Sequence, residues 1–320
     1  MKLVVVTGCM GFIGSYVTIK CLERGWQVYG IDKLTYAHSE QICAGLLRHP
    51  NFKFIRKDIC DVEYLPDCDY VINVAAETHV GNSIIKSDEF IKSNINGVKN
   101  LLDLIRQKPS NVARRPIFFH FSTDEVYGDI EEGDHTETDP LKPSNPYSAS
   151  KAAADMLVTA WSRTYGVDWI LLRPTNNYGY NQYPEKLVPL SVKLLQRGKK
   201  IRLHDKGEPI RNWLHADDTA AAVMTIIDSG TVNEIYNVAG GFEQKNWKTV
   251  KTIIETYFEL TEDKKVNWKD YVDLTYVREG QDVRYSLNDD KLRALGWTAK
   301  KDFNKEIKEI VKFYIEHFRW

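Results

Sequence analysis

Short apolar segments alternate with stretches of helical periodicity along most of the chain. Each segment has four or five residues, which is the length of a buried strand, and is rich in residues that favour strands. A chain that alternates strands and helices builds a parallel sheet with helices on both faces. The pattern therefore predicts an α/β fold with a doubly wound parallel sheet, and its seven strands are expected at Leu3–Val6, Val28–Ile31, Phe52–Ile55, Tyr70–Val74, Ile117–Phe121, Trp169–Leu172 and Glu234–Val238.

The regular alternation fails after Arg173-Pro174, where Pro184, Pro189 and Pro209 interrupt the pattern. Helical periodicity returns only at Trp247–Leu260 and Asp302–Phe318. No internal repeat, low-complexity tract or flexible linker separates the two parts. We therefore expect a second, smaller region in the C-terminal half.

Composition is that of a soluble enzyme and argues against a nucleic-acid or membrane partner. The 320 residues are 43% apolar with a formal net charge of −1, so no basic balance favours nucleic acid. The apolar run near Met1 is too short for a signal or membrane segment. Five cysteines without a C-x-x-C pair indicate reduced thiols and a cytoplasmic protein. Eight histidines without ligand spacing indicate no metal site.

The N-terminal strand leads into a glycine loop, in which Gly8, Gly11 and Gly14 have the spacing G-x-x-G-x-x-G. Glycines allow the backbone to approach a pyrophosphate at a helix N-terminus, although a glycine triplet alone often marks only a turn. A second strand ends at Asp32, which is placed to bind the ribose hydroxyls and to repel the 2′-phosphate of NADP. The loop therefore predicts a Rossmann-type site for NAD, with Lys33 positioned to soften that repulsion.

Two adjacent acids, Asp124 and Glu125, follow the apolar strand Ile117–Phe121. The carboxyl ends of parallel strands open into the ligand crevice, so both acids are expected to reach one substrate. An acid and a base on neighbouring carbons are what the removal of water requires. The alternative is that Thr123-Asp124-Glu125 only turns the chain and caps a helix.

Tyr147 and Lys151 lie four residues apart at the start of a long helical pattern, and therefore on one helix face. A tyrosine accepts a proton from a hydroxyl only if its pKa falls from about 10 toward about 7, a change of roughly 4 kcal/mol. A lysine charge about 4 Å away supplies about that much at an effective dielectric near 20. The alternative is a packed tyrosine beside a surface lysine.

Together these motifs resemble the extended short-chain dehydrogenase/reductase family, and within it the nucleotide-sugar 4,6-dehydratases of the dTDP-glucose or UDP-glucose type. The likeness runs nearly end to end. Sister epimerases share the glycine loop and Y-x-x-x-K but carry small residues at positions 124 and 125. The segments that carry the resemblance are 32–37, 58–59, 75–80, 122–128, 147–151, 176–179, 184–187, 211–214 and 282–285.

The resemblance implies a reaction in which NAD is reduced and then restored. Tyr147, assisted by Lys151, takes the C4 hydroxyl proton while hydride leaves C4, and Thr123 binds the oxygen at C4. Glu125 removes the C5 proton, Asp124 protonates the departing C6 hydroxyl, and hydride returns to C6. The product is the 4-keto-6-deoxy sugar.

The resemblance also implies binding residues, domains and assembly. The cofactor contacts are expected at Gly8, Gly11, Phe12, Ile13, Gly14, Asp32, Lys33, Asp58, Ile59, Ala75, Ala76, Asn94, Ser122, Tyr147 and Lys151. Substrate contacts are expected at Thr123, Asn176, Glu185, Lys186, Arg211, Asn246 and Arg284. Residues 1–175, with 212–240 returning, form the NAD domain, and 176–211 with 241–320 form an interleaved nucleotide-sugar domain. Helices around 87–105 and 147–165 pair two copies into a homodimer.

Two departures from the bacterial dTDP-glucose pattern leave the nucleotide and sugar open. Gly81-Asn82 replace an Asp-Arg pair, and Gln281 replaces a histidine. The stretch 181–186 resembles plant UDP-glucose dehydratases, whereas 240–243 is closer to the bacterial type. A 4-epimerase or decarboxylase would need the glycine loop and Tyr147-Lys151 but not the acid pair. A non-enzymatic NAD-binding protein would explain the glycines alone.

Overall fold

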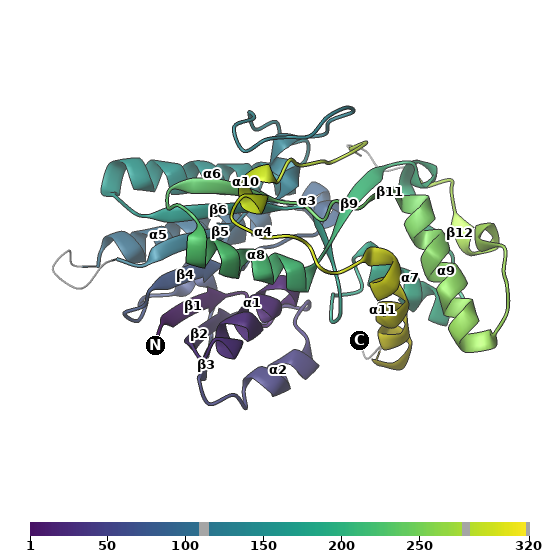
Figure 1. The fold of residues 1–320 in the computed structure, drawn as a ribbon, viewed down its shortest axis with the longest axis horizontal. Coiled ribbons are helices and arrows are strands. Elements are labelled where there is room, and N and C mark those ends of the chain that lie inside the picture. Colours follow the sequence, from purple (N-terminus) through teal and green to yellow (C-terminus); the bar gives the residue numbers. More distant parts are fainter. Residues whose placement is uncertain (109–114, 277–281, 318–320) are drawn as a thin grey trace.

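Seven parallel strands form the central sheet of a computed structural model that describes residues 1–108, 115–276 and 282–317. The strand order is β10-β6-β5-β4-β1-β2-β3, which is a doubly wound Rossmann-type arrangement (Figure 1). All seven predicted strands are present, so the predicted α/β fold is confirmed. Their bounds are β1 Leu3–Thr7, β2 Gln27–Asp32, β3 Phe52–Arg56, β4 Tyr70–Asn73, β5 Ile117–Phe121, β6 Trp169–Pro174 and β10 Glu234–Val238.

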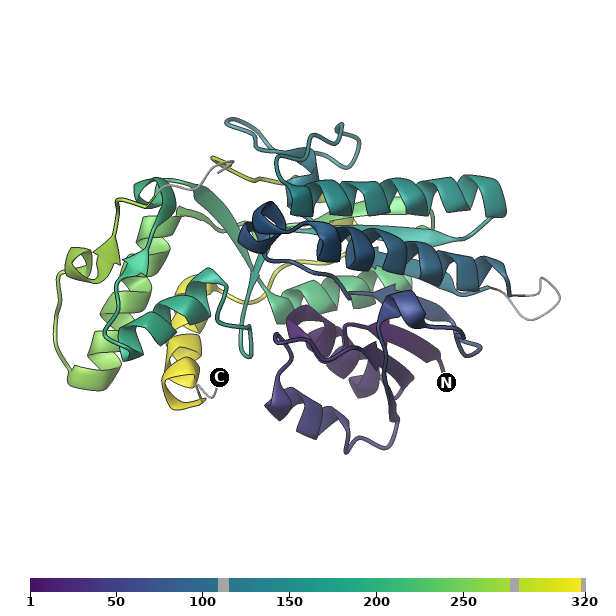
Figure 2. The same ribbon diagram turned by 180° about the vertical axis from the view of Figure 1, so that it is seen from behind.

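Helices cover both faces of this sheet because neighbouring strand residues point to opposite sides. In β1, Val4 and Val6 enter one core and Val5 enters the other. The first core is closed by α1 (Phe12–Glu23), α2 (Glu40–Leu46) and α8 (Ala216–Ser229). The second is closed by α5 (Gly97–Arg106) and α6 (Pro146–Tyr165), which lie side by side in Figure 2.

The segment expected to be one long helix around 87–105 is interrupted. It consists of α4 (Asp88–Phe90), a π-helix (Ile91–Asn96) and α5, preceded by α3 (Val80–Ile85). A π-helix is often found at functional sites because it displaces side chains from the regular helical register. Here it carries Asn94, one of the expected cofactor residues.

A smaller region lies beside the carboxyl ends of the sheet (Figure 1). Its core joins α7 (Leu187–Gln196), α9 (Asn246–Glu262) and α11 (Phe303–His317), so the two helices predicted in the C-terminal half are confirmed, although Phe318 lies outside the described residues. The remaining elements are short: β7 Asn176–Tyr178, β8 Ile201–Arg202, β9 Ile210–His215, β11 Glu243–Lys245, β12 Val272–Asp273 and α10 Asp290–Arg293.

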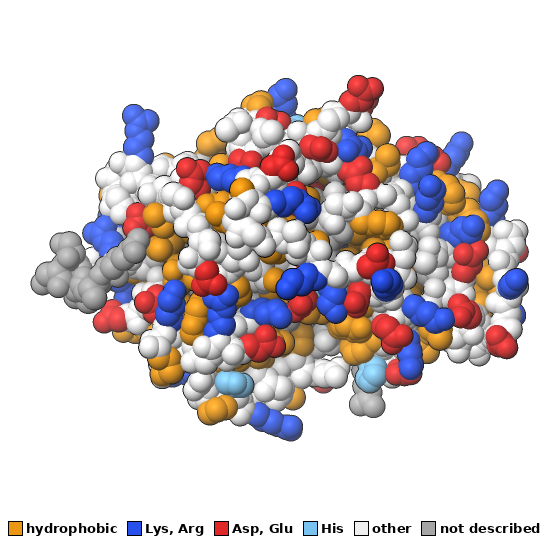
Figure 3. Space-filling view, viewed as in Figure 1, with side chains coloured by type: hydrophobic (Ala, Val, Ile, Leu, Met, Phe, Trp, Pro, Cys, Tyr) orange, Lys and Arg blue, Asp and Glu red, His pale blue; other side chains and the backbone are white. Residues whose placement is uncertain are grey.

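The stretch 212–240, which the sequence assigned to the larger domain, contributes α8 to the first core of the central sheet. Only β10 joins the central sheet, whereas β9 lies in a separate three-stranded sheet between β11 and β7. Of these three strands, β7 contributes residues to the cavity described below. On the face shown in Figure 3, acidic and basic side chains are interspersed.

Candidate active site

A cavity follows the carboxyl ends of the central strands, where ligands bind in open α/β sheets. It extends from the loop after β1, past the ends of β4 and β5, to β7 and the start of α7. Nineteen of the expected site residues line it: Gly8, Gly11, Phe12, Ile13, Gly14, Asp32, Lys33, Asp58, Ile59, Ala75, Ala76, Ser122, Thr123, Asp124, Glu125, Tyr147, Asn176, Glu185 and Lys186. The other five, Lys151, Asn94, Arg211, Asn246 and Arg284, are not among its lining residues.

The glycine loop forms a backbone cradle that has no room for side chains. Gly8 has φ +67°, and a Cβ on Gly14 would lie 2.0 Å from the Gly8 carbonyl oxygen. No side chain caps the N-terminus of α1 at Gly11. The first amides of a helix have no intrahelical acceptor, so this N-terminus can bind a pyrophosphate. The loop therefore fits the diphosphate of NAD.

Asp32 ends β2 and faces the cavity with both carboxylate oxygens hydrogen-bonded by backbone. Its Oδ2 accepts from Met10 N at 3.0 Å and its Oδ1 accepts from Leu34 N at 2.8 Å. Burial raises the pKa of Asp32, and these two amides oppose that rise, with the Lys33 charge contributing least among the opposing influences. The carboxylate is therefore fixed in place, and Lys33 does little to neutralise it.

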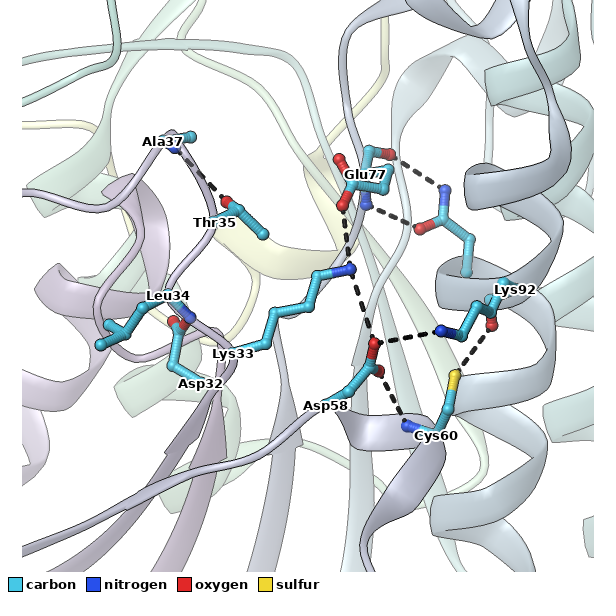
Figure 4. Close-up of polar contacts among 10 residues, drawn as sticks. Asp32, Lys33, Leu34, Thr35, Ala37, Asp58, Cys60, Glu77 and Lys92 are labelled. Atoms are coloured by element: carbon cyan, nitrogen blue, oxygen red, sulfur yellow. Dashed lines mark hydrogen bonds and ion pairs between the residues drawn. The ribbon is translucent and has the colours of Figure 1, made fainter.

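Lys33 is instead held by two other carboxylates (Figure 4). Its Nζ lies 3.1 Å from Glu77 Oε1 and 3.7 Å from Asp58 Oδ2. Asp58 also accepts from Cys60 N at 3.0 Å, and its Oδ2 lies 3.9 Å from Lys92 Nζ. These partners lower the pKa of Asp58 although burial opposes them. The charge of Lys33 is therefore compensated by residues other than Asp32.

Asn94 holds the loop after β4 from behind. Its Oδ1 accepts from Glu77 N at 2.8 Å, and its Nδ2 donates to the Glu77 carbonyl at 3.0 Å and to Ser150 Oγ at 2.9 Å. Asn94 is fully buried. It therefore supports the cavity wall, and a direct contact with the cofactor stays a prediction.

The acid pair follows β5 in a 3-10 helix, Asp124–Tyr127, which Thr123 caps through the bond from Glu125 N to Thr123 Oγ1 at 3.3 Å. The helix cap that the sequence offered as an alternative is therefore present, but capping does not explain why the Asp124 carboxyl is buried. Asp124 is 3% exposed; its Oδ1 accepts from Thr123 at 3.1 Å, and its Oδ2 is buried without a hydrogen bond. Burial, together with the charge of Glu125, raises the pKa of Asp124 to about 7.

Glu125 lies beside Asp124 but has different partners. Burial raises its pKa, whereas a hydrogen bond from Asn145 Nδ2 to Oε2 at 3.3 Å and the charges of Arg211 and Lys186 oppose the rise. Two carboxyls with unlike surroundings can hold different protonation states at one pH. The pair can therefore supply one acid and one base.

Tyr147 is the second residue of α6 and lies beside the acid pair. The sequence predicted that Lys151, with the oxidised nicotinamide adding its positive charge, brings the pKa of Tyr147 down, and this stays a prediction. Burial and the charge of Glu125 raise the pKa, while a contact with the Thr123 hydroxyl opposes the rise. Proton acceptance by Tyr147 therefore needs a further positive charge in the cavity.

Lys151 points under the sheet end, where its Nζ donates to the Phe121 carbonyl. Burial lowers the pKa of Lys151 to about 8, and the charge of Asp155 opposes that change. The lysine is 3% exposed, so the alternative of a surface lysine is excluded. It holds the end of β5 against α6 and so fixes the acid pair relative to Tyr147.

Residues of the smaller region close the cavity from the other side. Glu185 Oε2 accepts from Tyr36 Oη at 2.9 Å, and Lys186 Nζ donates to the Thr78 carbonyl at 2.8 Å. Asn176 Oδ1 lines the cavity and is buried without a hydrogen bond. These contacts join loops that are more than one hundred residues apart in the sequence.

The two expected pyrophosphate arginines are engaged with protein oxygens. Arg211 donates to the carbonyls of Ile210 at 2.7 Å and Asp282 at 3.2 Å. Arg284 makes a two-point contact with Glu243, at 3.0 Å and 3.1 Å. Asn246 starts α9 with its Oδ1 buried and without a hydrogen bond. Substrate binding by these three residues stays a prediction.

Sequence reasoning did not assign several residues that contact the expected site residues, among them Tyr36, Glu77 and Asn145. Tyr36 and Glu77 lie inside motifs that carried the resemblance, but nothing local shows what they contact. Asn145 had a usable signal, because an asparagine before Pro146 is typical of a helix start. Of the departures from the family pattern, Gly81 and Asn82 lie in α3, and Gln281 lies outside the described residues.

Among residues 1–108, 115–276 and 282–317, no cluster of three His, Cys, Asp or Glu side chains is arranged to hold a metal ion. Over the same ranges, no helix is long and apolar enough to cross a membrane.

Comparison with known proteins gives relatives that span the full chain. The family model described as GDP-mannose 4,6 dehydratase matches residues 5–310. The dTDP-glucose 4,6-dehydratase of Neisseria meningitidis is 40% identical over 100% of this chain and 95% of the relative. The low-salt glycan biosynthesis protein Agl12 of Haloferax volcanii is 36% identical over 98% of both chains.

Solved structures give the same picture. DesIV of Streptomyces venezuelae, a dTDP-glucose 4,6-dehydratase solved with NAD and dTDP bound, has a TM-score of 0.91 at 34% identity and covers 99% of this chain and 98% of its own. The UDP-glucose 4-epimerase of Thermotoga maritima has a TM-score of 0.85 at 25% identity, covering 99% of this chain and 100% of its own. Fold alone does not separate the two classes, but the adjacent acids Asp124 and Glu125 favour the dehydratases. This chain therefore belongs to the nucleotide-sugar 4,6-dehydratases of the short-chain dehydrogenase/reductase family.

Proposed function

We propose that this chain converts dTDP-glucose to its 4-keto-6-deoxy product by oxidation at C4, loss of water across C5 and C6, and reduction at C6. The observation that carries the proposal is the pair of adjacent acids, buried Asp124 and partly buried Glu125, beside Tyr147 in a cavity that also includes the glycine loop. Full-length similarity to dTDP-glucose 4,6-dehydratases supports this substrate. Bound NAD supplies the hydride acceptor at C4 and the hydride donor at C6.

In the first step, Tyr147 accepts the proton of the C4 hydroxyl. Thr123 lies between Tyr147 and Asp124 and binds the same oxygen. Lys151 keeps α6 against the end of β5, one helical turn after Tyr147. The oxidised nicotinamide of bound NAD would add a positive charge at this step, which would oppose the rise in the pKa of Tyr147.

Asp124 and Glu125 carry out the elimination of water. Once C4 is a ketone, the C5 hydrogen is acidic and Glu125 removes it, because Asn145, Arg211 and Lys186 favour its carboxylate form. Asp124, with its pKa raised to about 7, still carries a proton near neutral pH and donates it to the C6 hydroxyl. Water leaves in this step, and Glu125 returns the proton to C5 as the sugar is reduced.

Nucleotide preference is tested by comparing several nucleotide sugars and measuring the mass of each product. Incubation with dTDP-, UDP-, GDP- and CDP-glucose, without added cofactor, should give a product lighter by one water, most efficiently from dTDP-glucose. Thymine differs from uracil by one methyl, which a pocket discriminates by about 1–3 kcal/mol, or roughly 10–200-fold. Efficient use of a purine or cytidine sugar with rejection of both dTDP- and UDP-glucose would contradict the assignment. A product of unchanged mass would show an epimerase.

We also propose a cytoplasmic homodimer paired through the α5–α6 face. Ile85 is 86% exposed, Met156 59% and Ile91 46%, and α3 and the π-helix that carry two of them pack against α6. Exposed apolar side chains gathered on one face favour a protein contact. Sedimentation velocity should show a dimer for the wild type and a monomer for Met156→Lys. A monomeric wild type would contradict this part.

A further inference from the structure

Asn145 connects the two proton-transfer groups of the site. It is the N-cap of α6, the helix that carries Tyr147 and Lys151, and its Oδ1 accepts from Ser148 N at 2.9 Å. Ser148 Oγ in turn accepts from Asn145 N at 3.2 Å, which completes a capping box. On the other side, Asn145 Nδ2 donates to Glu125 Oε2 at 3.3 Å.

The capping hydrogen bond determines the orientation of the Asn145 side-chain amide. Because Oδ1 must accept from Ser148 N, the NH₂ group is forced toward Glu125. Asn145 is 8% exposed, so water does not readily replace this donor. A serine in its place would still cap the helix, but its hydroxyl is too short to reach Glu125 while accepting from the backbone.

We propose that Asn145 is a positioning residue that aims Glu125 at the C5 hydrogen and keeps it in its ionised, base-competent form, using the start of the Tyr147 helix as its anchor. This role rests on the proposed function for its chemical meaning. The hydrogen bond itself favours the carboxylate over the neutral acid, and in a buried site such a bond is stronger than in water.

Several charged groups face Glu125 besides Asn145. Asp124 lies on the same 3-10 helix, Arg211 on β9, Lys186 at the start of α7, and Asp282 and Tyr285 on the segment before α10. Asp282 is also tied to the cap, since its Oδ2 accepts from Ser144 Oγ at 2.6 Å. None of these groups changes in an Asn145 substitution, so its effect on the pH dependence is separable from theirs.

Two variants remove the donor and keep the cap. Asn145→Ser keeps an oxygen acceptor at the helix start, and Asn145→Asp keeps the acceptor but places a second carboxylate against Glu125. Ser148→Ala is the matched control, because it breaks the capping box without touching Glu125. The measurement is single-turnover kinetics in deuterated water against pH, following bound NADH and deuterium at C5.

We expect the rate of deuterium exchange at C5 to fall at acidic pH in Asn145→Ser, by about tenfold at pH 6. The rate should fall further in Asn145→Asp. NADH formation should change far less, and Ser148→Ala should slow neither step selectively. The proposal is overturned if exchange in Asn145→Ser has the wild-type pH profile, or if both steps change together as they do in Ser148→Ala.

A second measurement keeps this test independent of turnover. Carbon-13 NMR titration of the Glu125 carboxyl, assigned with Glu125→Gln, should show protonation at higher pH in Asn145→Ser than in the wild type. An unchanged titration overturns the inference even if dehydration is observed. A wild type that titrates as expected but forms no dehydrated product overturns only the proposed function.

Discussion

Replacing Asp124 by asparagine should make the protein more stable at neutral and basic pH while it slows the loss of water. Burial and the neighbouring Glu125 raise the pKa of Asp124 from 3.8 to about 7. One pKa unit corresponds to about 1.4 kcal/mol, so ionising this carboxyl costs about 4 kcal/mol more in the folded protein than in the unfolded chain. The asparagine side chain would have nearly the same shape and no charge.

The direction of this stability change with pH follows from the pH at which Asp124 releases its proton in the folded and in the unfolded protein. The unfolded chain releases it near pH 3.8, whereas the folded protein keeps it until about pH 7. Between these values the folded state binds more protons, so Asp124 makes the protein less stable as the pH rises. The advantage of Asp124→Asn should therefore grow by roughly 3 kcal/mol between pH 5 and pH 8.

Urea unfolding of NAD-free protein at pH 5 and pH 8 measures this difference. Asp270→Asn is the matched control, because Asp270 is exposed and should show the same stability difference at both pH values. In the same Asp124 variant, loss of water should slow by about 10²–10⁴-fold while NADH still forms. If the gain in stability of Asp124→Asn does not depend on pH, the raised pKa of Asp124 is refuted. If this variant loses water at the wild-type rate, the role of Asp124 as the acid is refuted.

Three further predictions address the cofactor side of the site. Tyr147→Phe should slow NADH formation in a single turnover by about 10²–10⁴-fold; near-normal formation would place the base elsewhere. Gly14→Ala puts a Cβ 2.0 Å from the Gly8 carbonyl, so the purified variant should carry little NAD and melt at lower temperature than the wild type. Glu77→Gln releases Lys33 from its 3.1 Å partner, so the NAD-to-NADP affinity ratio measured by calorimetry should fall by about tenfold, and an unchanged ratio would leave Asp32 as the sole selector.

The sequence by itself determined the sheet, the glycine loop and the identity of the catalytic candidates. Each rests on a local pattern: apolar runs of strand length, three glycines at fixed spacing, and two acids placed at the end of a buried strand. Such local patterns are sufficient because the right-handed connections between parallel strands allow few arrangements of the predicted elements. The carboxyl end of β5 had to face the cavity, and it does so with Thr123, Asp124 and Glu125.

Only the tertiary structure decided how the side chains are charged and held. Lys33 pairs with Glu77 rather than Asp32, Arg284 pairs with Glu243, and Asn145 reaches Glu125. These partners lie 20 to 44 residues apart in the sequence, at no spacing that a local pattern encodes. Burial likewise raises the pKa of Tyr147, and no local sequence pattern reveals that burial. A pKa depends on desolvation and on every nearby charge at once, and both exist only after the chain has packed.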